Sequence, residues 1–128
     1  MNALVLEWIK KTEADYHSAL RDSRARKYPN YDSAGFHAQQ CIEKYLKGIL
    51  LYFRQEPVWG HDLLAIVEKC ILFSPELELH KSLFAILTKF AVRYRYPGES
   101  ATKEEAKDAI RAMQDLRKLV RSELNLST

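Results

Sequence analysis

The sequence predicts an all-α protein built as a five-helix, up-and-down antiparallel bundle, and three observations support this prediction. Five segments repeat apolar residues at three- and four-residue steps, which places them on one face of an α-helix. Glycine and proline number only four each, so few positions interrupt long helices. Hydrophobic residues make up 47% of the chain and charged residues 29%, a balance that excludes a disordered protein. We therefore expect residues 1–128 to form a single helical domain.

The first two helices are expected before residue 54. The apolar steps of the first helix run from Val5 to Leu20, and residues 21–32 then carry basic residues and a Pro-Asn turn signal. This linker is either a solvated basic loop or a loop that contacts phosphate. The second helix has the strongest apolar pattern, Asp32 or Ser33 can cap its start, and Pro57 lies past its end. Its predicted inner face comprises Ala34, Ala38, Cys41, Ile42, Tyr45, Leu46, Ile49 and Phe53.

The third and fourth helices are shorter. The third begins near His61 with Asp62 as its cap, and Ser74-Pro75 marks the start of the fourth. The fourth must end near Tyr96 because Pro97 and Gly98 cannot continue it. The residues expected to face the core are Leu63, Ile66, Val67 and Cys70 in the third helix, and Leu79, Leu83, Ile86, Leu87 and Phe90 in the fourth.

The fifth helix is expected to begin near Thr102. Thr102 and Glu105 have the spacing of a capping box, in which each side chain satisfies a backbone amide of the other residue. Its predicted buried stripe comprises Ala106, Ala109, Ile110, Met113, Leu116 and Val120.

Cysteine usage and charge restrict the protein class. Cys41 and Cys70 lie in apolar helical contexts, which is typical of reduced core thiols rather than of a disulfide. No secretory signal is visible, and no stretch approaches the about 20 uncharged apolar residues that span a membrane. We therefore expect a cytoplasmic protein without membrane contact. A net charge of +3 permits contact with phosphates but is below the loading of a dedicated nucleic-acid binder.

The second helix carries a polar arc nearly opposite its apolar face. His37, Gln40, Lys44 and Lys47 fall in this arc at 100° per residue, as expected for an α-helix. A solvated face is the simplest interpretation. Because Phe36 and Leu51 flank the same arc, however, the pattern favours a buried or interface role.

The segment after the fourth helix concentrates groups that suit a nucleotide. Arg93, Arg95 and Tyr96 combine planar guanidinium groups, which bind phosphate, with a phenol that can stack on a base. The alternative is a helix end in which arginine pairs with carboxylates and tyrosine fills the core.

Motifs for metal or cofactor chemistry are absent from the sequence. The four histidines form neither an HExxH motif nor a close cluster with cysteines or carboxylates. There is no P-loop and no GxGxxG motif. We therefore expect no metal site and no cofactor.

Three segments together resemble the HEPN domain family. They are residues 34–52 (AGFHAQQCIEKYLKGILLY), 61–64 (HDLL) and 95–97 (RYP). The resemblance implies a five-helix bundle, usually dimeric, that works with a small nucleotidyltransferase of the MNT type. The candidate cleft or interface residues are Asp15, His37, Gln40, Glu43 and His61, and the candidate nucleotide or phosphate contacts are Arg93, Arg95, Tyr96, Lys44 and Lys47.

Some members of that family are toxins that cut RNA without a metal, using an arginine followed after four to six residues by a histidine. Neither Arg93 nor Arg95 has a histidine at that spacing, and no histidine occurs after residue 80. The formal match is Arg54 with His61, which lies in the connection after the second helix rather than late in the chain. Arg54 and His61 are therefore only weak catalytic candidates.

The leading hypothesis is a nucleotide- or RNA-linked binding module rather than an enzyme. It would be the HEPN partner of a small nucleotidyltransferase in a toxin–antitoxin-like pair, and would form a homodimer. The first alternative is a metal-independent ribonuclease toxin, and the second is a structural scaffold subunit.

Overall fold

The computed structural model describes residues 1–56 and 58–127. This part of the chain forms five α-helices and two short 3₁₀ helices, with no strand. The expected all-α helical bundle is confirmed, whereas Pro57 lies outside the described residues. In chain order the elements are α1 (Ala3–Arg24), α2 (Tyr31–Tyr52), α3 (Leu63–Ile71), η1 (Pro75–His80), α4 (Lys81–Val92), η2 (Arg93–Arg95) and α5 (Lys103–Glu123).

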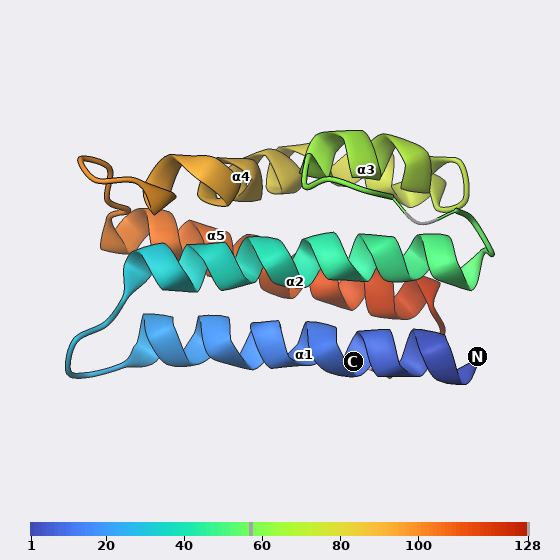
Figure 1. Cartoon of the computed structure of the whole chain (residues 1–128), viewed down its shortest axis with the longest axis horizontal. Helices are drawn as coiled ribbons and strands as arrows, with labels where there is room; N and C mark the ends of the chain where they lie inside the picture. Colours follow the sequence, from blue (N-terminus) through green and yellow to red (C-terminus); the bar gives the residue numbers. More distant parts are fainter. Residues whose placement is uncertain (57, 128) are drawn as a thin grey trace.

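Four long helices, α1, α2, α4 and α5, pack side by side with successive long helices antiparallel (Figure 1). The short helix α3 instead runs in the same direction as α2, because the connection between them turns back along the bundle before α3 begins (Figure 1). This return brings His61 beside Glu43 in the middle of α2.

Helix α2 lies at the centre of the bundle and contacts α1, α3, α4 and α5. Its predicted apolar face is buried from Ala34 to Ile49, whereas Phe53 is only partly buried at the C-cap. Gly35 lets α4 approach closely, since a Cβ atom there would lie 2.0 Å from the ring of Phe90. Because other helices surround α2 on most sides, mainly its polar residues remain to form a surface that a ligand could contact.

Side-chain caps begin α1, α2, α3 and α5, whereas α4 has none. Asn30, in extended conformation, accepts the amide of Ser33 at 3.0 Å, so the expectation that Asp32 or Ser33 caps α2 is wrong. Asp32 instead accepts the amide of Ala101 at 2.6 Å and ties the start of α2 to the residues before α5. The predicted Asp62 cap is confirmed. The capping box of Thr102 with Glu105 and the buried stripe of α5 are confirmed too.

The fourth helical segment differs from the prediction in its register. Residues from Pro75 to His80 wind as a 3₁₀ helix with three residues per turn, and the α-helix starts only at Lys81. The change of winding buries Leu77 and leaves Leu79 80% exposed, so the assignment of Leu79 to the core is wrong. Phe84, which the pattern missed, is fully buried.

Both cysteines are buried free thiols, as predicted. Burial raises the pKa of Cys70 to about 12 and that of Cys41 well above its ordinary value. Protonated, buried thiols are poor nucleophiles, so neither is suited to chemistry. No helix in the described part of the chain has the length and apolar character that crossing a membrane requires.

Candidate functional site

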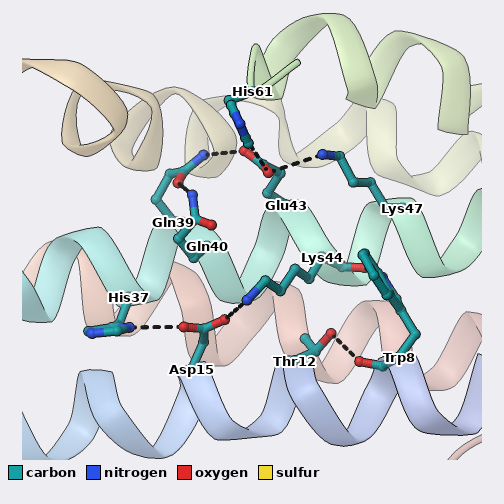
Figure 2. A network of polar contacts seen from close by, with 10 residues as sticks. All are labelled: Trp8, Thr12, Asp15, His37, Gln39, Gln40, Glu43, Lys44, Lys47 and His61. Carbon is teal, nitrogen blue, oxygen red and sulfur yellow. Dashed lines mark hydrogen bonds and ion pairs between the residues drawn. The ribbon is translucent and has the colours of Figure 1, made fainter. Parts of the chain in front are cut away.

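The basic residues in the polar arc of α2 are divided between two carboxylates (Figure 2). Asp15 of α1 receives His37 Nδ1 at 2.9 Å and Lys44 Nζ at 2.5 Å. The second carboxylate, Glu43 of α2, receives one imidazole and one ammonium group in the same manner. The arc is therefore not a row of unpaired cations.

The Asp15 cluster joins α1 to α2. The Asp15 side chain is only 12% exposed, and the indole Nε1 of Trp8 donates to the backbone oxygen of Lys44 at 2.6 Å beside it. The ion pair between Lys44 and Asp15 reduces the positive charge that Lys44 can offer to a phosphate. His37 and Lys44 thus join α1 to α2 within one chain.

The Glu43 cluster is more deeply buried at its carboxylate and open at its edge. Glu43 is 2% exposed and accepts from Lys47 Nζ at 3.3 Å, His61 Nδ1 at 2.9 Å and Gln39 Nε2 at 3.1 Å. Lys47 also donates to the backbone oxygen of Gly60 at 3.1 Å, which holds the approach to α3 against α2. Burying the carboxylate of Glu43 is costly without hydrogen-bond partners. The contact with Glu43 therefore holds the imidazole of His61 in place.

His61 is oriented by this contact. Its Nδ1 faces the carboxylate of Glu43, which favours the tautomer with the proton on Nδ1 and leaves Nε2 as an acceptor. The His61 side chain is 71% exposed, and its Nε2 has no hydrogen-bond partner among the described residues. The imidazole can therefore accept a proton or a hydrogen bond from a ligand.

His61 lies on the wall of an open hollow of 680 Å³ between α2, α4 and the start of α3. We call this hollow the basic groove. Arg95 lies in it with its Cζ atom 5.2 Å from the ring centre of Phe36, and makes no ion pair within the residues that the structure describes. The lining comprises Phe36, Gln40, His61, Asp62, Thr88, Ala91, Val92 and Arg95.

The predicted corner Arg93–Tyr96 divides into two parts. Arg93 pairs with Glu99 at 3.3 Å, and the buried Tyr94 donates to Glu105, a contact that raises the pKa of Tyr94 and lowers that of Glu105. Arg95 and Tyr96 remain exposed, Tyr96 by 64%. The helix-end interpretation thus holds for Arg93 and Tyr94, whereas Arg95 is open to a ligand.

A second hollow of 540 Å³ adjoins the basic groove at His61, and the sequence interpretation did not foresee it. We call it the apolar hollow. Trp59 at its edge is 90% exposed, and a tryptophan in a short loop beside Gly60 was the signal available in the sequence. Arg54 is exposed and lines neither hollow. The lining comprises Leu4, Trp8, Lys47, Leu50, Leu51, Gln55, Glu56, Val58, Trp59, Gly60 and His61.

Metal ligands are not gathered at either hollow: among the described residues, no group of three or more His, Cys, Asp or Glu side chains is placed to hold an ion. The polar groups that line the basic groove are the guanidinium of Arg95, the imidazole of His61, the amide of Gln40, the hydroxyl of Thr88 and the carboxylate of Asp62. Gln40 donates to Gln39 and Thr88 to the backbone oxygen of Phe84, so the guanidinium is the donor best suited to a phosphate.

Comparison with known proteins gives a family and a fold. The family model described as the HEPN domain matches residues 5–123. The crystal structure of TT1696 from Thermus thermophilus is similar with a TM-score of 0.74 and 24% sequence identity, covering 93% of this chain and 97% of that one. No curated protein matches the sequence. The structural likeness extends over nearly the whole bundle and, at this identity, shows the fold alone.

Proposed function

This chain belongs to the HEPN domain family, and from that premise we propose that residues 1–128 act as a single binding module for a nucleotide or RNA phosphate. The module would work in the cytoplasm as the HEPN partner of a small nucleotidyltransferase, in a toxin–antitoxin-like pair. The phosphate would lie in the basic groove.

The observation that carries this proposal is that Arg95 makes no ion pair among the described residues. Its guanidinium lies over Phe36 in an open groove without a carboxylate partner in the described chain, while the neighbouring Arg93 is paired with Glu99. An arginine stacked on a ring keeps its donors available for the two-point contact that phosphate accepts. Gln40 and Thr88 add polar groups to the same wall.

The two arginines provide a matched test. Arg95→Ala should weaken binding of adenosine monophosphate and of a five-residue oligoadenylate by about 10- to 100-fold, the range for losing a charged hydrogen bond. Arg93→Ala should change affinity less than about twofold because its charge is already paired. Titration calorimetry measures both. Equal affinities for wild type and Arg95→Ala would remove the basic groove from the proposal.

The partner and the oligomeric state are separate parts of the proposal, and family membership supports both. Co-expression with the nucleotidyltransferase encoded nearest to this chain should yield a complex that survives size-exclusion chromatography. The isolated chain should have the mass of a homodimer in light scattering. A complex that forms while every nucleotide probe fails to bind would instead indicate a scaffold subunit.

A second candidate function is metal-independent RNA cleavage, favoured by the orientation of His61. Glu43 fixes Nδ1 and leaves Nε2 as a base at the wall of a groove that also holds Arg95, the pairing of imidazole and guanidinium that phosphodiester chemistry uses. Arg54 lies outside this groove, so Arg95 is the better partner for His61. Incubation of RNA with wild type and His61→Ala in EDTA distinguishes the two functions. Cleavage that disappears in His61→Ala supports the enzyme, and intact RNA supports the binding module.

A further inference from the structure

We propose that the apolar hollow is a nucleobase site in which the ring of Trp59 stacks on the base of a single-stranded RNA or mononucleotide. This inference rests on the proposed function, because the phosphate of the same ligand would lie in the adjoining basic groove. The inference adds recognition of the base, which a phosphate site alone does not provide.

The first argument is the exposure of Trp59. Trp59 is 90% exposed at the edge of a hollow lined by Trp8 and aliphatic side chains, with Lys47, Gln55, Glu56 and His61 as its polar members. Leaving so large an apolar surface in water is unfavourable, and it is typical of a site that a ligand covers. A flat indole beside an apolar cavity matches the π-face of a base, which stacks on aromatic side chains without regard to sequence.

The second argument is the continuity of the two hollows. His61 lines both of them, so a ligand that extends past the imidazole would meet Arg95 on one side and Trp59 on the other. The wall between the hollows is held in place, since Lys47 binds Gly60 O and Glu43 binds His61 Nδ1. A nucleotide has this polarity, with an anionic phosphate at one end and a flat base at the other.

The third argument selects the occupant. An apolar segment of a protein partner could also fill a hollow of aliphatic and aromatic residues. It would offer no anion to the guanidinium of Arg95, which makes no ion pair among the described residues, whereas a phosphate offers a two-point partner. Unstacked bases are available in single strands and not in a duplex, so the ligand is single-stranded.

The experiment compares two probes on the full-length chain. One is a five-residue oligoadenylate, and the other is its abasic counterpart with the same ribose-phosphate backbone. Trp59→Leu removes the aromatic face and keeps an apolar side chain, while Trp59→Phe keeps a ring. Affinities are measured by titration calorimetry, and circular dichroism shows whether each variant keeps its helices.

Trp59→Leu should weaken binding of the oligoadenylate by about 5- to 100-fold, as expected for the loss of one stacking aromatic residue, and change binding of the abasic probe less than about twofold. Trp59→Phe should recover most of the loss. Arg95→Ala should weaken both probes, which separates the phosphate site from the base site.

Four outcomes would overturn the inference. If Trp59→Leu weakens neither probe while Arg95→Ala weakens both, the proposed function stands and the base site is wrong. If wild type binds both probes equally well, the base contributes nothing. If wild type binds neither probe, or Trp59→Leu only lowers the mass of an oligomer, the apolar hollow does not serve a base.

Discussion

Two carboxylates on opposite sides of α2 have similar partners and different surroundings. Glu13 of α1 contacts Tyr45 of α2, whereas Glu43 belongs to α2 itself. Positions 43 and 45 are about 200° apart around the helix, which places the two carboxylates on opposite sides of it. Glu13 accepts Arg117 at 2.5 and 2.9 Å and Tyr45 Oη at 2.6 Å, with Arg121 3.7 Å away. We call this set the Glu13 cluster, and Glu43 with its partners the Glu43 cluster.

The Glu13 cluster is closed. Burial alone would raise the pKa of Glu13, but the hydrogen bonds from Arg117 and Tyr45 and the charges of Arg117 and Arg121 outweigh burial and lower it. The hydrogen bond to Glu13 in turn raises the pKa of Arg117. The Glu43 cluster ends instead in His61, whose side chain is 71% exposed at two hollows. The difference teaches that a carboxylate whose partners are all buried serves to join helices. A carboxylate with one exposed partner, such as His61, also places that partner where a ligand can reach it.

The largest expected effect comes from breaking the Glu13 cluster. Arg117→Ala leaves Glu13 without its main partner and removes the guanidinium that lies 4.4 Å from the ring centre of Tyr16. Removing one partner of a buried pair costs about 3–5 kcal/mol, and the partial exposure of this pair reduces the expected loss of unfolding free energy to about 2–3 kcal/mol. Urea denaturation measures it. Arg95→Ala is the control and should cost less than about 0.5 kcal/mol; equal losses would abolish the contrast.

Acid should weaken the Glu13 cluster next. Because the folded-state pKa of Glu13 is below its ordinary value of 4.5, its stabilising contribution is present above that pH and is lost as the pH falls through the folded-state value. Glu13→Gln should therefore be less stable than wild type by about 1–2 kcal/mol at pH 7, with a difference that narrows below pH 4.5. Glu7→Gln, an exposed change on the same helix, should track wild type throughout. A pH-independent difference for Glu13→Gln would contradict the assignment.

Tyr45→Phe removes one hydroxyl from the same cluster. Tyr45 is fully buried, and its oxygen donates to Glu13 and accepts from Arg121 at 3.0 Å. Burial first, and then the hydrogen bond to Glu13, raises the pKa of Tyr45, so the phenol stays protonated and the bond persists at neutral pH. Loss of this bond should lower the unfolding free energy by about 1 kcal/mol in urea denaturation. An unchanged midpoint would mean that water or Arg121 replaces the hydroxyl.

The smallest change in stability is expected in the Glu43 cluster. His61→Ala should lower the unfolding free energy by less than about 1 kcal/mol, because Glu43 keeps Lys47 and Gln39 as partners and most of the imidazole is in solvent. The same variant should weaken oligoadenylate binding in calorimetry, since His61 is the shared wall of both hollows. A large loss of stability with unchanged binding would reverse the roles assigned to the two clusters.

The prediction from sequence was most successful where burial follows helical spacing. The inner faces of α2 and α5 were predicted from the three- and four-residue steps, as were the Asp62 cap and the Thr102–Glu105 box. It failed at Leu79, because periodicity assumes α-helical winding and the chain winds there as a 3₁₀ helix. It also missed that Asn30, one position before α2, takes the cap.

The site could be predicted only in part. His37, Gln40, Lys44 and Lys47 were recognised as one arc, but the division of its three basic residues between two carboxylates depends on Asp15, which comes from another helix. The sequence could not show which of the two arginines is paired with a carboxylate and which is open to a ligand. Only folding places Glu99 beside Arg93 and not beside Arg95. Trp59 was missed because a lone exposed residue has no periodic partner in the sequence.

Local spacing therefore specified the helices and the caps Asp62 and Thr102, since these depend on residues a few positions apart. The return of the chain before α3 determined the rest. It carries His61 back to Glu43, eighteen positions earlier, and places the imidazole between the hollows of Arg95 and Trp59. Contacts at that separation arise only when the helices pack, because burial of the shared core fixes which side chains meet.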